Sequence, residues 1–113
     1  MTFHFDCVFY YVSDLERSLR FYRDVLGFKP VSRDYVARFE IDGVLFELVP
    51  APHHQTLQGN GNARLCLAVD NMDRALDELQ GLGVHTNKAE TKEGALGFFK
   101  DPDGNEICLW QSA

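Results

Sequence analysis

The sequence predicts an α+β fold built from two βαβββ modules within one 113-residue domain. Three observations indicate it. The stretch at 12–19 returns in similar form at 69–76, each copy follows an apolar run, and each ends in a Leu-Gly pair at 26–27 or 82–83. A repeated unit that cannot bury its inner surface alone packs against another copy. We therefore expect the paired modules to form a curved mixed sheet around a cavity.

The first module opens with an apolar run at 7–12, and its lack of alternation is typical of a strand covered on both faces. Ser13 and Glu16 predict a capping box at the start of a helix, and Gly27 predicts its end. A tight hairpin turn at 42–43 joins the last two of three further strands. We expect these strands at 28–33, 35–41 and 44–49.

The second module repeats this order, with a first strand at 63–69 and a helix capped by Asp70. A turn at 101–105 (Asp-Pro-Asp-Gly-Asn) joins its last two strands. The later strands are expected at 84–87, 95–100 and 106–110. Helical spacing predicts a buried stripe on the helix, consisting of Met72, Ala75, Leu76, Leu79 and Leu82.

The domain is expected to consist of module one at 1–50, a linker at 51–62 and module two at 63–113. The linker is polar and rich in residues that form turns. It contains the pair His53-His54, whose adjacent side chains point apart. We interpret this pair as part of a solvated loop and not as a metal site.

Composition excludes several functions. A net charge of −6 without a cluster of basic residues argues against nucleic-acid binding. No apolar run reaches the length of a membrane span, and no secretory signal is visible, so we expect no membrane partner. Three cysteines, an odd number, lie in apolar runs at 7, 66 and 108. This usage indicates reduced thiols and a cytoplasmic protein.

Strand parity predicts which side chains share the concave face of each module. In module one these are Cys7, Phe9 and Tyr11 on the first strand and Leu45, Glu47 and Val49 on the last. In module two they are Arg64, Cys66 and Ala68, then Glu106, Cys108 and Trp110. A shift of one residue would invert each set.

The motif at 12–28, VSDLERSLRFYRDVLGF, and the Asp-Pro-Asp-Gly-Asn turn at 101–105 closely resemble the vicinal oxygen chelate superfamily. That superfamily includes glyoxalase I, extradiol dioxygenases, and the fosfomycin- and bleomycin-resistance proteins. The resemblance covers essentially the whole chain and implies the paired-module fold. Its motifs are specific for the fold and do not select a reaction.

The resemblance also implies four positions that hold a divalent metal in the metal-dependent members. They fall on Cys7, Glu47, Arg64 and Cys108, and only Glu47 is a customary ligand type there. Arg64 has donors, no acceptor and a permanent positive charge, so it cannot ligate a cation. The two cysteines could bind zinc as thiolates together with Glu47, but a guanidinium at the fourth position makes that set poor. We therefore expect no catalytic metal.

Glu47 and Arg64 allow two interpretations. Arg64 could neutralise a buried Glu47 where the metal would sit, either as structural filler or as a catalytic pair that holds a carbonyl or anionic ligand. Cys7 and Cys108 are candidate nucleophiles, although apolar strands usually hold cysteine as a small core residue. Phe9, Tyr11 and Trp110 either line a pocket for a flat ligand, with Trp110 the best stacking candidate, or fill the core.

Three functions follow. The first is a small-molecule-binding protein, expected to be a homodimer, that sequesters its ligand without a catalytic metal. The second is a lyase, isomerase or dioxygenase that acts on a small carbonyl- or oxyanion-bearing substrate through Glu47. The third is a protein with a collapsed cavity that acts through its dimer surface.

Overall fold

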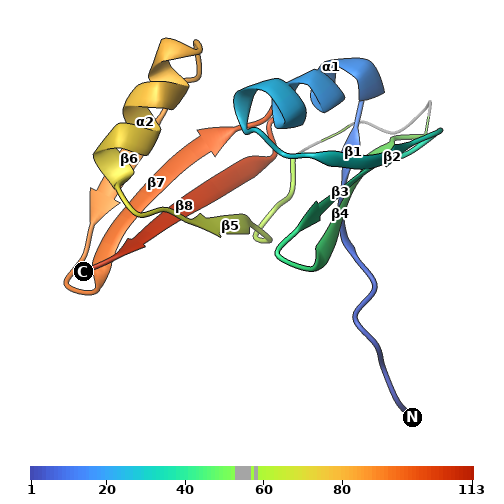
Figure 1. The fold of residues 1–113 in the computed structure, drawn as a ribbon, viewed down its shortest axis with the longest axis horizontal. Helices are drawn as coiled ribbons and strands as arrows, with labels where there is room; N and C mark the ends of the chain where they lie inside the picture. Colours follow the sequence, from blue (N-terminus) through green and yellow to red (C-terminus); the bar gives the residue numbers. More distant parts are fainter. Residues whose placement is uncertain (53–56, 58) are drawn as a thin grey trace. The chain divides into compact units, whose positions relative to one another are not determined.

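The computed structural model describes residues 1–52, 57 and 59–113, so the prediction for His53-His54 lies outside the described residues. The chain divides into two compact units, Met1–Leu57 and Gln58–Ala113, which we describe one at a time. Each unit has the order βαβββ, and its four strands form a mixed sheet with the helix on one face (Figure 1). The predicted α+β class and the two βαβββ modules are therefore confirmed.

The sheet of unit one has the strand order β1-β4-β3-β2. Strand β1 runs parallel to β4, and the other neighbours are antiparallel. The helix continues beyond α1 as a π-helical segment, η1, and ends before Gly27, whose φ of 75° confirms the predicted stop. The elements are β1 (Val8–Val12), α1 (Leu15–Arg20), η1 (Phe21–Val25), β2 (Pro30–Arg33), β3 (Ala37–Ile41) and β4 (Val44–Pro50).

Helix α1 begins one residue later than predicted. Asp14, and not Ser13, is the N-cap, and its carboxylate accepts a hydrogen bond from the backbone N–H of Arg17 at 3.1 Å. The Ser13 hydroxyl accepts from the Arg17 guanidinium at 2.8 Å instead. The Glu16 carboxylate forms an ion pair with Arg33 of β2. Two good capping residues stand side by side here, and the pattern alone does not choose between them.

The predicted hairpin turn between β3 and β4 is confirmed. Asp42 and Gly43 both have positive φ, 50° and 80°, as a two-residue turn of this type requires. Such a turn fixes the strand register, and the register places Arg38 directly opposite Glu47. Alternate residues then face the helix, while Arg38 and Glu47 face away from it.

Aromatic rings fill the space between the helix and the sheet in unit one. The Phe46 ring centre lies 5.2 Å from that of Tyr22 and 5.4 Å from that of Tyr10. Phe28 and Phe39 complete the cluster, with their ring centres 5.9 Å apart. Tyr22, Phe39 and Phe46 are almost fully buried. Edge and tilted contacts of this kind stabilise the core beyond simple burial of area.

Unit two has the same topology, with strand order β5-β8-β7-β6 and β5 parallel to β8. Most predicted strands agree to within one or two residues, but β6 begins at Asn87, where the sequence pattern placed the end of that strand. The elements are β5 (Leu65–Ala68), α2 (Met72–Gly81), β6 (Asn87–Glu90), β7 (Gly94–Lys100) and β8 (Glu106–Ser112).

The ends of helix α2 correct two predictions. Asn71, and not Asp70, is the N-cap, and its side-chain oxygen accepts from the backbone N–H of Arg74 at 3.0 Å. Leu82 is 58% exposed and does not belong to the buried stripe, because the helix ends at that point and Gly83 takes a φ of 86°. Ala75 is half-buried. The rest of the stripe is buried as predicted: Met72, Leu76 and Leu79.

The helix of unit two packs closely on its sheet at Gly97. A methyl group placed on Gly97 would lie 2.7 Å from the Met72 sulfur and 3.1 Å from a Leu76 methyl carbon. Both distances are shorter than ordinary contact, so a glycine permits the close approach of α2 to β7.

Asn60 connects the segment before β5 to the start of β8. Its side-chain nitrogen donates to the Glu106 carbonyl at 2.8 Å, and its side-chain oxygen accepts from the Glu106 N–H at 3.0 Å. The adjacent Gly59 lies so near Gly104 that a methyl group on it would meet the Gly104 carbonyl oxygen at 2.9 Å. Residues 59 and 60 are therefore held against the turn before β8 and the first residue of that strand.

No helix within residues 1–52, 57 and 59–113 is long and apolar enough to cross a membrane.

Candidate functional site

Each sheet has one face toward its own helix and one opposite, which we call the distal face. On β1 of unit one, Tyr10 and Val12 face the helix and are buried, whereas Phe9 and Tyr11 are 45% and 40% exposed on the distal face. This alternation agrees with the predicted parity. The rings of Phe9 and Tyr11 meet edge to face with their centres 5.3 Å apart. The distal face of unit one therefore presents a preformed aromatic pair.

Glu47 lies at the centre of the same face and forms an ion pair across the sheet. Its carboxylate accepts from Nε of Arg38 at 3.2 Å, and the two side chains are 17% and 27% exposed. Arg38 also contacts Ser32 and Asp34, at 3.3 and 3.2 Å. The pKa of Asp34 is lowered by hydrogen bonds from the backbone N–H of Val36 and from Arg38. Glu47 thus has a cationic partner within its own unit.

Our sequence reasoning missed Arg38, although a signal for it exists. A two-residue turn at 42–43 pairs residues symmetrically about itself, so Arg38 must lie opposite Glu47. Phe9 is the partner of Glu47 on the other side, in strand β1. The row Phe9–Glu47–Arg38 therefore crosses the centre of the distal face.

Cys7 is half-buried just before β1 and lies beside Glu47. Burial raises the pKa of the Cys7 thiol, and the Glu47 charge and hydrogen bonding to Asp6 and Glu47 raise it further. A raised pKa keeps this thiol protonated, which makes it a weak nucleophile and a weak metal ligand.

Arg64 lies just before β5 in unit two and also has a partner within its unit. Its guanidinium contacts the Glu106 carboxylate at 3.0 Å, and both side chains are 31% exposed. It also donates to the carbonyl oxygens of Gly61 and Ala63, the latter at 3.0 Å. The predicted catalytic residues Glu47 and Arg64 are therefore each engaged by another charged side chain.

Two cysteines are register partners on the parallel strands β5 and β8. Cys66 lies opposite Cys108, and both point to the distal face of unit two. Cys66 is exposed and Cys108 is buried. Burial raises the pKa of Cys108, the neighbouring Cys66 raises it further, and Arg64 lowers it. The two sulfurs are thus close enough to influence each other's charge.

Trp110 continues this face of β8 and lies opposite Leu96 of β7. It is half-buried, and two of its ring carbons would be 2.9 Å from a methyl group placed on Gly94. The indole ring therefore covers the Gly94 backbone.

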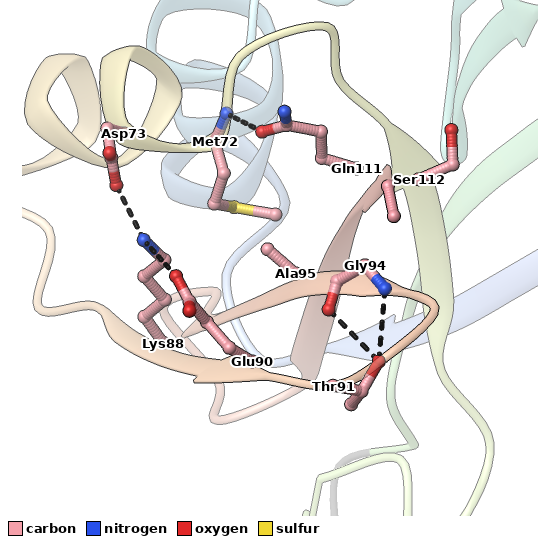
Figure 2. A pocket seen from close by; sticks show the side chains of 10 residues that line it. Met72, Asp73, Lys88, Glu90, Thr91, Gly94, Ala95, Gln111 and Ser112 are labelled. Atoms are coloured by element: carbon pink, nitrogen blue, oxygen red, sulfur yellow. Dashed lines mark hydrogen bonds and ion pairs between the residues drawn. The ribbon is translucent and has the colours of Figure 1, made fainter.

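A polar cavity of about 260 Å³ lies away from the predicted site, where the start of α2 meets the ends of β6, β7 and β8 (Figure 2). Within it, the Lys88 ammonium contacts Asp73 at 2.8 Å and Glu90 at 2.9 Å. The Gln111 side chain accepts from the Met72 N–H at 2.6 Å, at the start of the helix. These interactions join the helix to the strands, so we assign the cavity a structural role.

The fold with its two βαβββ units, together with a family model, defines the class of protein. The chain belongs to the Glyoxalase/Bleomycin resistance protein/Dioxygenase superfamily, whose family model matches residues 4–109.

Particular relatives refine this assignment. The chain is 31% identical to a lactoylglutathione lyase of Pseudomonas putida over 82% of this chain and 76% of that protein. It is 27% identical to TnmS3, an antibiotic binding protein from Streptomyces sp. CB03234, with a TM-score of 0.81 over 99% of this chain and 98% of that one. The fosfomycin resistance protein FosX from Mesorhizobium loti shares the fold at 20% identity, with a TM-score of 0.77 over 100% of this chain and 95% of that one.

Proposed function

We propose that this protein binds a flat, largely apolar small molecule on the distal face of the sheet of unit one and does so without a catalytic divalent metal. The exposed Phe9–Tyr11 pair beside the Arg38–Glu47 ion pair is the observation that carries the proposal. The antibiotic-binding relative TnmS3 supports a binding role.

The aromatic pair supplies affinity, and the ion pair supplies orientation. Two exposed rings in an edge-to-face arrangement offer a rigid apolar surface that a planar ligand can cover. Ligand sites generally combine such surfaces with a few fixed polar groups. Arg38 and Glu47 fill that second role because their mutual contact and the cross-strand register hold both side chains in place.

The chemistry of the side chains supports binding without a divalent metal. Of the four positions at which metal-dependent relatives place ligands, Arg64 offers no acceptor and contacts Glu106. Glu47 contacts Arg38, and the raised pKa of Cys7 disfavours the thiolate that a metal needs. These residues do not fit a divalent cation.

A ligand screen with matched variants tests the proposal. Planar aromatic compounds, each paired with a saturated analogue, are tested by thermal shift and then by calorimetry. We expect stabilisation by planar members only, through binding to the folded state. Phe9→Ala and Tyr11→Ala should each weaken binding about tenfold, the effect of losing one stacking contact of roughly 1.5 kcal/mol.

Tyr35→Ala is the matched control, because Tyr35 is 77% exposed in the connection between β2 and β3. It should leave binding unchanged. Equal loss in all three variants, or equal binding of planar and saturated compounds, would contradict the proposal.

The lyase relative from Pseudomonas putida favours a second candidate, a lyase that uses Glu47. In this case Glu47 would exchange a proton with a carbonyl-bearing substrate. The protein is supplied with methylglyoxal and glutathione, with and without added zinc or nickel, and the absorbance of S-lactoylglutathione reports whether their adduct is converted. Turnover that is abolished by Glu47→Gln would establish the lyase and displace the binding proposal.

We further propose that the protein is a cytoplasmic homodimer. Three free cysteines support a reducing compartment, and the exposed rings of Phe3 and Phe5 before β1 support a protein partner. Light scattering at several protein concentrations measures the mass. A monomer at all concentrations would overturn the dimer.

A further inference from the structure

We infer that Cys66 and Cys108 form a two-thiolate site for a soft monovalent cation of the copper(I) type, which lies on the distal face of unit two. The inference rests on the register of β5 and β8, which places the two cysteines directly opposite each other on one face of the sheet. It is independent of the ligand-binding proposal for unit one.

The spacing of the strands suits such an ion. Neighbouring strands lie about 4.8 Å apart, and side chains at paired positions leave the sheet nearly in parallel. A metal–thiolate bond is about 2.3 Å long for zinc, so an ion held in a line between two sulfurs separates them by roughly 4.6 Å. The general spacing of paired strands is therefore compatible with two thiols that bind one ion between them.

The number of donors selects the kind of ion. Among the residues that the structure describes, no group of three or more His, Cys, Asp or Glu side chains is placed to hold a metal. Zinc and the harder divalent ions take four or more ligands and would be poorly held here. Copper(I) prefers soft sulfur ligands and accepts a coordination number of two.

Charged side chains lie beside the two thiols. Two thiolates and one copper(I) ion carry a net charge of −1, and both thiol protons are released on binding. Burial, Cys66 and Glu106 raise the pKa of Cys108, and the Arg64 guanidinium lowers it. Because Arg64 is paired with the Glu106 carboxylate at 3.0 Å, these two charges largely offset each other, and the affinity of copper(I) for sulfur has to drive the release of the protons. Cys66 is exposed, which gives the ion a route of entry.

Copper(I) binding can be measured directly. The reduced, metal-free protein is titrated anaerobically with copper(I) in competition with the chromogenic chelator bathocuproine disulfonate. We expect one tightly held ion per chain, with two sulfur neighbours in the X-ray absorption spectrum. Silver(I), which has the same preference for two soft ligands, should compete for the site.

Matched variants locate the site. Cys66→Ser should weaken binding by roughly 100-fold or more, since even the loss of a residue that only hydrogen-bonds to a metal ligand costs about 10–100-fold. Cys66 is exposed, so this variant should keep its fold, whereas Cys108→Ser replaces a buried residue and is checked by circular dichroism. Cys7→Ser is the control and should bind as the wild type does.

Wild-type affinity in Cys66→Ser would overturn the inference, as would equal loss in Cys7→Ser or more than two sulfur neighbours. None of these results bears on the Phe9–Tyr11 surface, so the two proposals can fail separately.

Discussion

The two units share a topology and differ in what fills the two faces of their sheets. On the helix side, unit one has an aromatic cluster around Phe46, whereas unit two has mostly aliphatic side chains with one buried ring, Phe99, and the close approach at Gly97. On the distal side, the central row of unit one carries the Arg38–Glu47 ion pair, and that of unit two carries a pair of thiols. The same topology therefore carries different core side chains and different polar side chains in the two units.

On the helix side of each sheet, the size of one strand residue is matched to the size of the first residue of the helix. Ala37 lies opposite Leu48 in unit one, and Gly97 lies opposite Leu109 in unit two, so the two positions are equivalent. The first helical residue is Leu15 in one unit and Met72 in the other. A longer side chain on the helix thus accompanies a smaller residue on the strand, as close packing of a fixed volume requires.

The largest effect is expected from Phe46→Ala. Phe46 is 1% exposed and contacts several rings, so its truncation should lower the free energy of unfolding by about 3–5 kcal/mol. Urea unfolding monitored by circular dichroism measures the change. Val44→Ala on the same strand, where Val44 is 41% exposed, is the control and should cost less than about 0.5 kcal/mol. Similar losses in both variants would show that the aromatic cluster is not the core of unit one.

Gly97→Ala should have the next largest effect, about 1–3 kcal/mol, because the added methyl group meets Met72 and Leu76. The double variant Gly97→Ala/Met72→Leu installs the residues found at the equivalent positions of unit one, and it should be more stable than the sum of the single changes predicts.

Gly81→Ala is the control, and it should raise the free energy of unfolding where Gly97→Ala lowers it. Gly81 lies in α2 with open space around it, so alanine there should stabilise by about 0.5–1 kcal/mol. If the free-energy changes of Gly97→Ala and Met72→Leu simply add in the double variant, the sizes of these two residues are not matched to each other.

The ion pair of unit one should contribute more to stability than the ion pair of unit two. Arg38→Gln should lower the urea midpoint more than Arg64→Gln, because Glu47 is less exposed than Glu106 and loses its partner in a less hydrated environment. The reverse order would mean that the Arg64–Glu106 pair is the more important of the two.

The smallest effect concerns the Cys7 thiol. Its pKa is raised by burial and then by the Glu47 charge, so its alkylation by iodoacetamide should be slower than that of the exposed Cys66 at pH 8. Glu47→Gln removes the charge, lowers the pKa and should speed alkylation of Cys7 alone, as peptide mass spectrometry can show. An unchanged alkylation rate at Cys7 would show that the Glu47 charge does not affect the pKa of this thiol.

The elements could be predicted from the sequence because their signals are local. The repeat, the helix stops at Gly27 and Gly83, and the turn at Asp42-Gly43 depend on residues a few positions apart. Helix starts were less certain, because Ser13 and Asp70 stand beside the residues that cap the helices.

Of the candidate site, one contact could be predicted from the sequence and another could not. The Arg38–Glu47 contact follows from a two-residue turn and was within reach of the sequence. The pairing of Cys66 with Cys108 was not. Parallel strands are joined by long crossovers, and no turn fixes their register.

The double hydrogen bond of Asn60 to Glu106 has a practical consequence. A side-chain amide that donates to and accepts from one backbone residue imitates a further rung of the β5–β8 ladder. A shortened protein intended to isolate the second half of the chain should therefore start before Gly59. One that starts at Leu65, the first strand residue, would lose this rung together with Arg64 and leave the Glu106 carboxylate without its cation.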